Sequence, residues 1–202
     1  GMATDEDDAV ASVFACRTLD YLFFFTDQGR AYRIRAYEVP DADRAARGIP
    51  IVNLINLAEG ERITAAVAVS PAWMEGTEAN GGDRYLVMAT RLGKVKRVPL
   101  NEFLTTRSTG LVAIQLEEGD ELQDVCLSDG AGDLLLVTAR GQALRFEEAE
   151  VRPMGRAAAG VRGIRLEEGD QVIALDRADP EGELLVVTAG GFGKRTPIGQ
   201  YP

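Results

Sequence analysis

The side chains best placed to do chemistry in this sequence are four arginines that recur at one position. Arg33, Arg97, Arg145 and Arg195 each follow a threonine by seven residues, and a glycine stands three residues after each threonine. A guanidinium group binds phosphate oxygens or carboxylates through two parallel hydrogen bonds. These arginines therefore have two possible roles. They could contact phosphates, or they could stabilise the fold by bridging to acidic turns of a neighbouring unit.

Further basic residues lie beside the same turns or on the loops that follow them, where a packed core rarely needs a charge. They are Arg30, Arg35, Arg44, Arg47, Lys94, Lys96, Arg107, Arg156 and Lys194. With the recurring arginines they make up the candidate phosphate-binding set. Strand alternation after Gly93 places Lys94 and Lys96 on one side and Arg97 on the other. We expect the lysines to face a ligand at low cost in stability, and Arg97 to anchor the fold.

Several catalytic chemistries are excluded by composition. The chain has no histidine, which removes Ser-His-Asp and Cys-His catalysis and histidine-ligated zinc. Its two cysteines, Cys16 and Cys126, are too few for a structural zinc site or a disulfide framework. Acidic residues recur at the same turn of each unit, as a structural feature does, whereas a catalytic pair would break the repeat. We expect no cofactor, no metal and no catalysis.

Four segments that superpose without gaps must position these arginines: Leu22–Gly29, Leu86–Gly93, Leu134–Gly141 and Leu184–Gly191. Each reads as an apolar strand, a glycine turn and a second strand. A third strand is expected in each of the runs Ile51–Leu57, Leu111–Leu116 and Val161–Leu166, and a Glu-Gly-Glu or Glu-Gly-Asp turn then leads to a fourth. Four short strands in each unit of about 50 residues predict an all-β, propeller-like array of blades.

The repeats also set the domain organisation. We expect a single domain over residues 1–202, with units that start near residues 21, 84, 133 and 183, the last incomplete. Residues 1–20 form a partial blade, in which Asp7–Ala15 match the fourth strand of a unit. The stretch Pro71–Asp83 is an inserted loop. Such an array is an incomplete ring, which leaves at least one sheet edge open.

Charge alternates along the chain, although its sum is −10. Residues 84–110 carry six basic side chains and one acidic, and residues 111–133 carry seven acidic and none basic. Because the same phase of each repeat lies at the same place in an array, this pattern predicts a basic rim and an acidic opposite edge. The acidic start and the short apolar runs predict neither a signal peptide nor a membrane span, so a cytoplasmic location is expected.

Several stretches resemble a known family, the C-terminal domains of DNA gyrase A subunits. They are Asp27–Pro40, Ala46-Arg-Gly-Ile-Pro-Ile-Val-Asn-Leu54, Tyr85–Thr90, Leu104–Gly110, Gly160-Val-Arg-Gly-Ile-Arg-Leu166 and Gly193–Thr196. The resemblance implies a β-pinwheel whose blades exchange a strand with their neighbours. It also implies a non-catalytic domain that bends double-stranded DNA around a basic outer rim, within a holoenzyme containing the rest of gyrase A and gyrase B and associated with the nucleoid.

Two alternatives stay open at this point. The family's Gln-Arg-Arg-Gly-Gly-Lys-Gly loop, which would separate gyrase from topoisomerase IV, is absent from this sequence. The equivalent C-terminal domain of topoisomerase IV is therefore the near alternative, and the Arg47–Leu54 match favours gyrase. The distant alternative is a blade-repeat module that binds proteins through its acidic edge, which the net charge favours.

Overall fold

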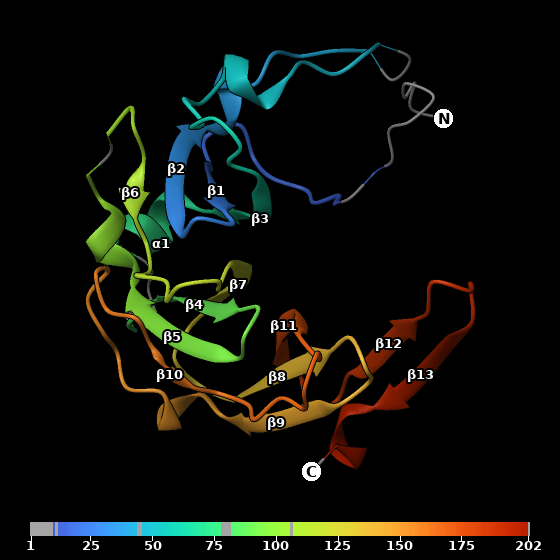
Figure 1. Ribbon diagram of the computed structural model, residues 1–202. Coiled ribbons are helices and arrows are strands. Elements are labelled where there is room, and N and C mark those ends of the chain that lie inside the picture. The colour runs from blue at the N-terminus through green and yellow to red at the C-terminus, as the bar shows by residue number, and fades with distance from the viewer. Residues whose placement is uncertain (1–9, 11, 44–45, 78–81, 106, 202) are drawn as a thin grey trace.

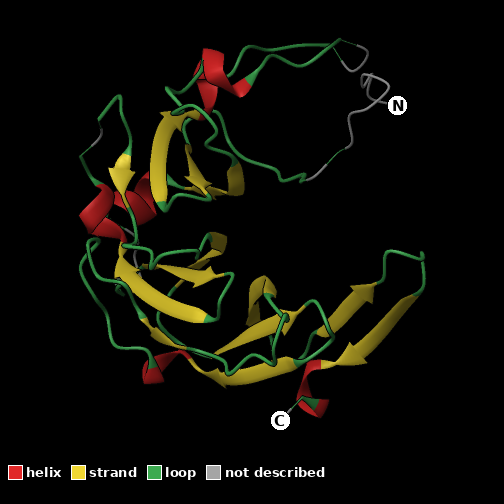
Figure 2. Ribbon diagram, in the orientation of Figure 1, coloured by secondary structure: helices red, strands yellow, loops and turns green. Residues whose placement is uncertain are grey.

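The structure is a computed structural model that describes residues 10, 12–43, 46–77, 82–105 and 107–201. Within them the regular secondary structure is almost entirely β, and the helices are short (Figure 2). The strands are β1 (Tyr21–Thr26), β2 (Arg30–Arg35), β3 (Ile63–Val69), β4 (Tyr85–Thr90), β5 (Lys94–Pro99), β6 (Leu111–Val112), β7 (Leu122–Ser128), β8 (Asp133–Thr138), β9 (Ala143–Glu147), β10 (Val161–Arg162), β11 (Val172–Ala178), β12 (Glu183–Val187) and β13 (Gly193–Pro197). The predicted fold class is confirmed.

Each sheet is a blade, and neighbouring blades share a strand. The first blade has the order β3-β1-β2-β6 and the second β10-β5-β4-β7, while the third contains β11-β8-β9 and the fourth β12-β13. Strand β6 belongs to the second unit of the sequence and pairs with β2 of the first. In the same way β10 comes from the third unit and pairs with β5 of the second. This is the strand exchange that the family resemblance implies.

The blades are arranged as an open arc with distinct inner and outer edges (Figure 1). The inner strands β3, β7 and β11 lie next to one another, and the Leu175 amide of β11 donates to Oδ2 of Asp124 in β7 at 2.9 Å. At the opposite edge of the first two blades lie the exchanged strands β6 and β10. The surface on the outside of the arc is therefore made of strand edges and of the loops that lead into them.

The recurring threonine and glycine close the hairpin of each blade. The threonine hydroxyl accepts the backbone amide four residues later, at 3.0 Å in the second blade and 3.1 Å in the third. Gly29, Gly93, Gly141 and Gly191 have φ between 74° and 89°, a region that disfavours side chains. The repeated Thr-x-x-Gly pattern is therefore a turn signature.

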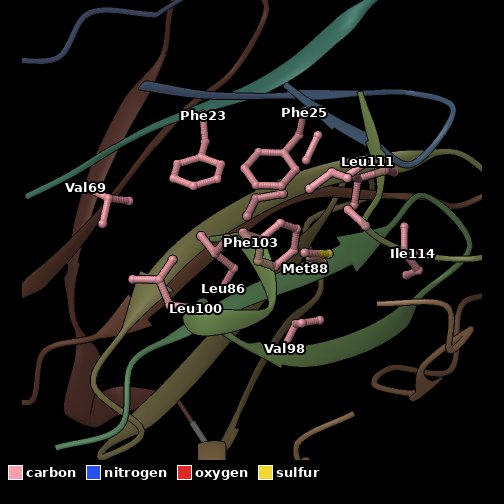
Figure 3. Packing of buried hydrophobic residues seen from close by; sticks show 14 of the residues in the cluster. Phe23, Phe25, Val69, Leu86, Met88, Val98, Leu100, Phe103, Leu111 and Ile114 are labelled. Atoms are coloured by element: carbon pink, nitrogen blue, oxygen red, sulfur yellow. The ribbon is translucent and has the colours of Figure 1, made fainter. Parts of the chain in front are cut away.

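The central strand β4 of the second blade is buried on both faces. Leu86 and Met88 of β4 pack against Phe23 and Phe25 of the first blade, in the cluster drawn in Figure 3. Val87 and Ala89, which alternate with them, belong to a second cluster with Leu134 and Leu136 of the third blade. A strand buried on both faces is expected to be apolar at every position, as β4 is.

Three expectations about single elements are wrong. The run Ile51–Leu57 contains the 3-10 helix η2 (Ile51–Asn53) in place of a strand. Its counterparts pair with the outer edge of the preceding blade, and the described residues hold no blade before the first. The third strands β6 and β10 are two residues long, much shorter than the predicted runs. Residues 10 and 12–15 form no strand, and the rest of Asp7–Ala15 lies outside the described residues.

The insertion after β3 begins with helix α1 (Pro71–Glu75) where a loop was expected. The Ser70 hydroxyl accepts the Trp73 amide at 3.2 Å, and Pro71 occupies the first helical position. Gly76 ends the helix with φ of 66°. These are favourable residues for the start and the end of a helix, so local capping explains this one turn.

The close approach of the exchanged segment to β5 gives a stability prediction. A Cβ at Gly163 would lie 2.3 Å from Cγ2 of buried Val95. We expect Gly163→Ala to destabilise the fold by about 1–3 kcal/mol through overpacking. The control is Gly48→Ala, whose new Cβ meets nothing within 4 Å. Denaturant unfolding measures both, and equal midpoints for the two variants would contradict the close packing of this segment on β5.

Candidate nucleic-acid interface

The first two recurring arginines join their blade to the next one. The Arg33 guanidinium donates to the carbonyl oxygens of Phe103 at 2.8 Å and Leu104 at 3.1 Å, at the 3-10 helix η3 (Leu100–Phe103) of the second unit. Nη1 of Arg97 lies 3.3 Å from Oε1 of Glu148, in η4 (Glu148–Glu150) of the third unit. Both groups of this ion pair are buried. Arg97 therefore lies where an anchoring residue was expected.

The third and fourth arginines, Arg145 and Arg195, are also paired within the fold, but they are more exposed than Arg97. Arg145 forms an ion pair with Asp133 of its own blade at 2.5 Å, and its Nη1 lies 3.5 Å from the Ile198 carbonyl in η5 (Ile198–Gln200). Arg195 pairs with Glu183 at 2.9 Å and is exposed. The structural role of these arginines is thus a bond to the following 3-10 helix or to their own hairpin. Of the four, Arg97 bridges to an acidic residue of the neighbouring unit as predicted, but at η4 and not at a Glu-Gly-Asp turn.

Two tyrosines extend these contacts by stacking. The Arg35 guanidinium lies 3.5 Å from the ring centroid of Tyr21, with Arg33 at 4.7 Å from the same ring. Arg97 lies 4.5 Å from the ring centroid of Tyr85. Burial, opposed by Tyr21 and reinforced by Arg35, lowers the pKa of Arg33 below its ordinary value. The positive charge of these arginines is therefore committed to neighbours within the fold.

The expectation that Lys94 and Lys96 line an exposed rim is wrong for Lys96. The alternation itself is right, because Lys94 and Lys96 share a side that Arg97 does not. However, both faces of this blade pack against other blades, so neither side faces solvent as a whole. Lys96 is 0% exposed and donates to two backbone carbonyls, while Lys94 is half-buried and pairs with Glu117. Replacing Lys96 is accordingly expected to cost stability.

The other predicted residues have varied surroundings. Arg30 lies 5.9 Å from the Tyr32 ring, and Arg35 also donates to the Leu19 carbonyl at 2.7 Å. Arg156 donates to the Val112 carbonyl at 3.1 Å, and its Nε lies 3.9 Å from Glu102. The exposed residues of the set, besides Arg195, are Arg47, Arg107 and Lys194. Arg44 lies outside the described residues.

The sequence reasoning missed three arginines on the outer edge. Arg152 lies on the loop before β10, Arg162 within β10, and Arg165 just after it, and all three are exposed. We name them, with Arg107 on the loop before β6, the outer-edge arginines. Their guanidinium groups make no hydrogen bond or ion pair with another described residue. A signal was present, since Arg162 and Arg165 stand in a run that was predicted as a third strand and alternates apolar with polar residues.

The predicted separation of a basic rim from an acidic opposite edge is also wrong. The acidic turns lie at the same end of each blade as the hairpin turns, because the strand after each acidic turn pairs with the first strand of the hairpin. Oδ1 of Asp120 accepts the Leu92 amide at 2.9 Å, and Oδ1 of Asp170 accepts the Arg140 amide at 3.0 Å. Arg140 also lies 4.0 Å from Glu167. These acids hold the hairpin turns, and they offset nearby positive charge.

Among the described residues, no group of three or more Cys, Asp or Glu side chains is arranged to hold a metal ion. No helix in the described part of the chain is long and apolar enough to cross a membrane.

Comparison with known proteins identifies the family. A family profile described as "DNA gyrase C-terminal domain, beta-propeller" matches residues 20–70, 84–125, 132–179 and 182–202. The chain belongs to this family. The resemblance seen in the sequence is therefore confirmed, and the beta-propeller description agrees with the blades of this structure.

Relatives and solved structures agree with this assignment. The chain is 48% identical to the DNA gyrase A protein of Clostridium acetobutylicum over 99% of its length, and 43% identical to that of Mycobacterium leprae over all of it. It spans 23% and 15% of the length of these two relatives. A solved DNA gyrase A C-terminal domain matches with a TM-score of 0.75 at 27% identity, covering 92% of this chain and 57% of that one. The C-terminal domain of a DNA topoisomerase IV matches with a TM-score of 0.79 at 30% identity, covering 100% and 60%.

The buried ion pair gives a prediction for this gyrase-family domain. Arg97→Ala leaves the Glu148 carboxylate buried without its cation, which is expected to cost about 3 kcal/mol of stability. Arg195→Ala removes the equivalent arginine from an exposed pair, and the expected cost is below about 1 kcal/mol. Chemical denaturation of both variants measures the difference. If the two variants lose equal stability, Arg97 has no anchoring role.

The buried lysine gives a pH prediction. Burial, followed by the nearby Arg156 charge, lowers the pKa of Lys96 to about 8, and Glu102 opposes the shift. The unfolded state then binds more protons than the folded state between about pH 8 and pH 10.5, so this lysine makes stability rise with pH across that window by up to about 3 kcal/mol. The difference in unfolding free energy between the parent and Lys96→Met should show this rise. A difference that stays constant from pH 7 to pH 10 would contradict the lowered pKa.

Proposed function

We propose that this chain binds double-stranded DNA along the outer edges of its blades and bends it, as the non-catalytic C-terminal domain of a DNA gyrase A protein. The observation that carries the proposal is the set of exposed outer-edge arginines, whose guanidinium groups are unpaired among the described residues. In the cell the chain would act with the rest of gyrase A and with gyrase B, in the cytoplasm at the nucleoid.

Arginines of this kind suit a phosphate backbone. An exposed guanidinium with no internal partner is free to form charge-assisted hydrogen bonds with phosphate oxygens. Phosphate contacts carry no base information, so the binding is expected to tolerate sequence. At the hairpin ends the basic side chains are already neutralised, because Lys94 pairs with Glu117 and Arg140 pairs with Glu167. Charge therefore favours the outer edge over the hairpin ends as the DNA-binding surface.

Bending follows from the arrangement of the blades. The outer edges of successive blades lie along an arc, which is visible in Figure 1. A duplex that contacts the edge loops of more than one blade must follow that curvature. Smooth bending of a short duplex costs on the order of 1–6 kcal/mol, which a few additional phosphate contacts can offset.

Two alternatives to a gyrase domain were left open by the sequence, a topoisomerase IV domain and a protein-binding module. The structural match to a topoisomerase IV C-terminal domain keeps that family member as the near alternative, and both would bend DNA. The curated relatives above are gyrase A proteins, which favours gyrase. A protein-binding module that uses the acidic turns would require no free cations at the outer edge.

Salt dependence and charge removal test the proposal together. If about six phosphates are contacted, affinity for duplex DNA should fall by roughly 10³ between ~50 and ~200 mM salt. Arg107→Ala and Arg162→Ala should each lower the slope of log affinity against log salt by about one, for every DNA sequence alike. The matched control is Arg140→Ala, an exposed arginine at a hairpin turn, which should leave the slope unchanged. Binding that ignores salt, or an equal effect of all three variants, would overturn the outer-edge assignment.

A further inference from the structure

Lys96 occupies an unusual place for a lysine. It lies in the middle of β5, is 0% exposed, and faces the first blade next to the buried Met88. Its Nζ donates to the Ala113 carbonyl at 2.7 Å and to the Arg156 carbonyl. Burial of an ammonium group costs free energy unless partners satisfy it, and here both partners are backbone oxygens.

These two carbonyls belong to different blades. Ala113 directly follows β6, the outer strand of the first blade, whereas Arg156 lies on the segment that leads into β10, the outer strand of the second. Two other hydrogen bonds span the same joint, from the Arg156 guanidinium to the Val112 carbonyl at 3.1 Å and from the Gln115 amide to the Ala158 carbonyl at 3.2 Å. Lys96 is therefore at the centre of the contact between two outer edges.

The joint reaches the molecular surface. A hollow of about 330 Å³ opens there, lined by Glu102, Val112 and residues 155–158. The loop of Arg107 leads into one side of the joint, and the strand of Arg162 leaves the other. A change in the angle at this joint would therefore alter the distance between outer-edge arginines of neighbouring blades.

The repeat shows that a blade does not need an amine at this position. The equivalent residue of the first blade is Tyr32, whose hydroxyl donates to Glu61 of its own blade at 2.9 Å. In the third blade the equivalent residue is Leu144, which packs against an apolar cluster. In the fourth blade the equivalent residue is Lys194, which is exposed. Core packing alone therefore does not account for a lysine that is buried, and its bonds across the joint distinguish Lys96 from all three counterparts.

We propose that Lys96 is a positioning residue that fixes the angle between the outer edges of the first and second blades, and so sets how far bound DNA bends at their joint. The proposal rests on the proposed function. Lys96 itself contacts no phosphate, since its ammonium group is buried and bonded within the fold.

The experiment measures bend and phosphate contacts separately in the 202-residue chain. A short duplex labelled with a donor and an acceptor at its two ends reports the bend by energy transfer, and a salt titration reports the number of phosphates. Lys96→Met keeps the unbranched chain up to the ε position and removes the ammonium group with its donors. We expect a loss of energy transfer in the bound duplex with a parental salt slope. The matched control is Leu144→Met, at the same repeat position of the third blade, which should keep both values.

Each outcome decides the matter. Parental energy transfer in a folded Lys96→Met chain would overturn the proposal, and so would a salt slope lowered as in Arg162→Ala, because Lys96 would then act as a phosphate contact. If Lys96→Met does not fold, Lys96→Gln, whose shorter arm cannot reach both carbonyls, takes its place with the same expectation. Failure of both to fold would make Lys96 a residue of general stability and refute the positioning role. Failure of the parent chain to bind DNA would instead refute the proposed function.

Discussion

The burial of both faces of a blade is the constraint on which the rest of this structure depends. Leu86 and Met88 pack towards the first blade while Val87 and Ala89 pack towards the third, so β4 has no solvent face. A charged side chain on such a strand must either find partners inside the interface, as Arg97 and Lys96 do, or lie at a strand end. The surface available to a large ligand is then limited to edges and connecting loops, where the outer-edge arginines lie.

The same constraint explains why net charge is a poor guide to the partner of this chain. Asp120 and Asp170 accept backbone amides of the hairpin turns, and Glu148 is buried against Arg97. Asp120 and Asp170 recur because each blade needs its hairpin turn held, and together with Glu148 they contribute to the total of −10 whatever the chain binds. A ligand responds to the local field, which depends on the charges left unpaired at the surface it meets.

The β fold and the hairpins could be predicted from the sequence, because a threonine and a glycine at fixed spacing carry a local turn mechanism. The family followed from the resemblance of stretches such as Ala46–Leu54. The partner of each third strand could not be predicted, since the pattern at Leu111 and Val112 is the same whether the strand pairs within its unit or with the unit before it. The alternation of side chains along β5 correctly placed Lys96 and Arg97 on opposite faces of the strand. It carries no information about whether solvent or another blade covers each face. Arg162 was missed for a related reason, because the predicted third strand gave no sign that it would form the outer edge of the preceding blade.

Strand exchange has a consequence for how the chain is made. Strand β10 is covalently part of the third unit and structurally part of the second blade, so the second blade keeps an open edge at β5 until residues 161–162 have left the ribosome. The second blade can therefore complete its sheet only after part of the third unit has been synthesised, so folding lags behind synthesis by about one unit. The same arrangement means that a protease cut between β7 and β8 would leave β10 on one fragment bound to the sheet of the other, so the two pieces would remain associated as a nicked but assembled protein.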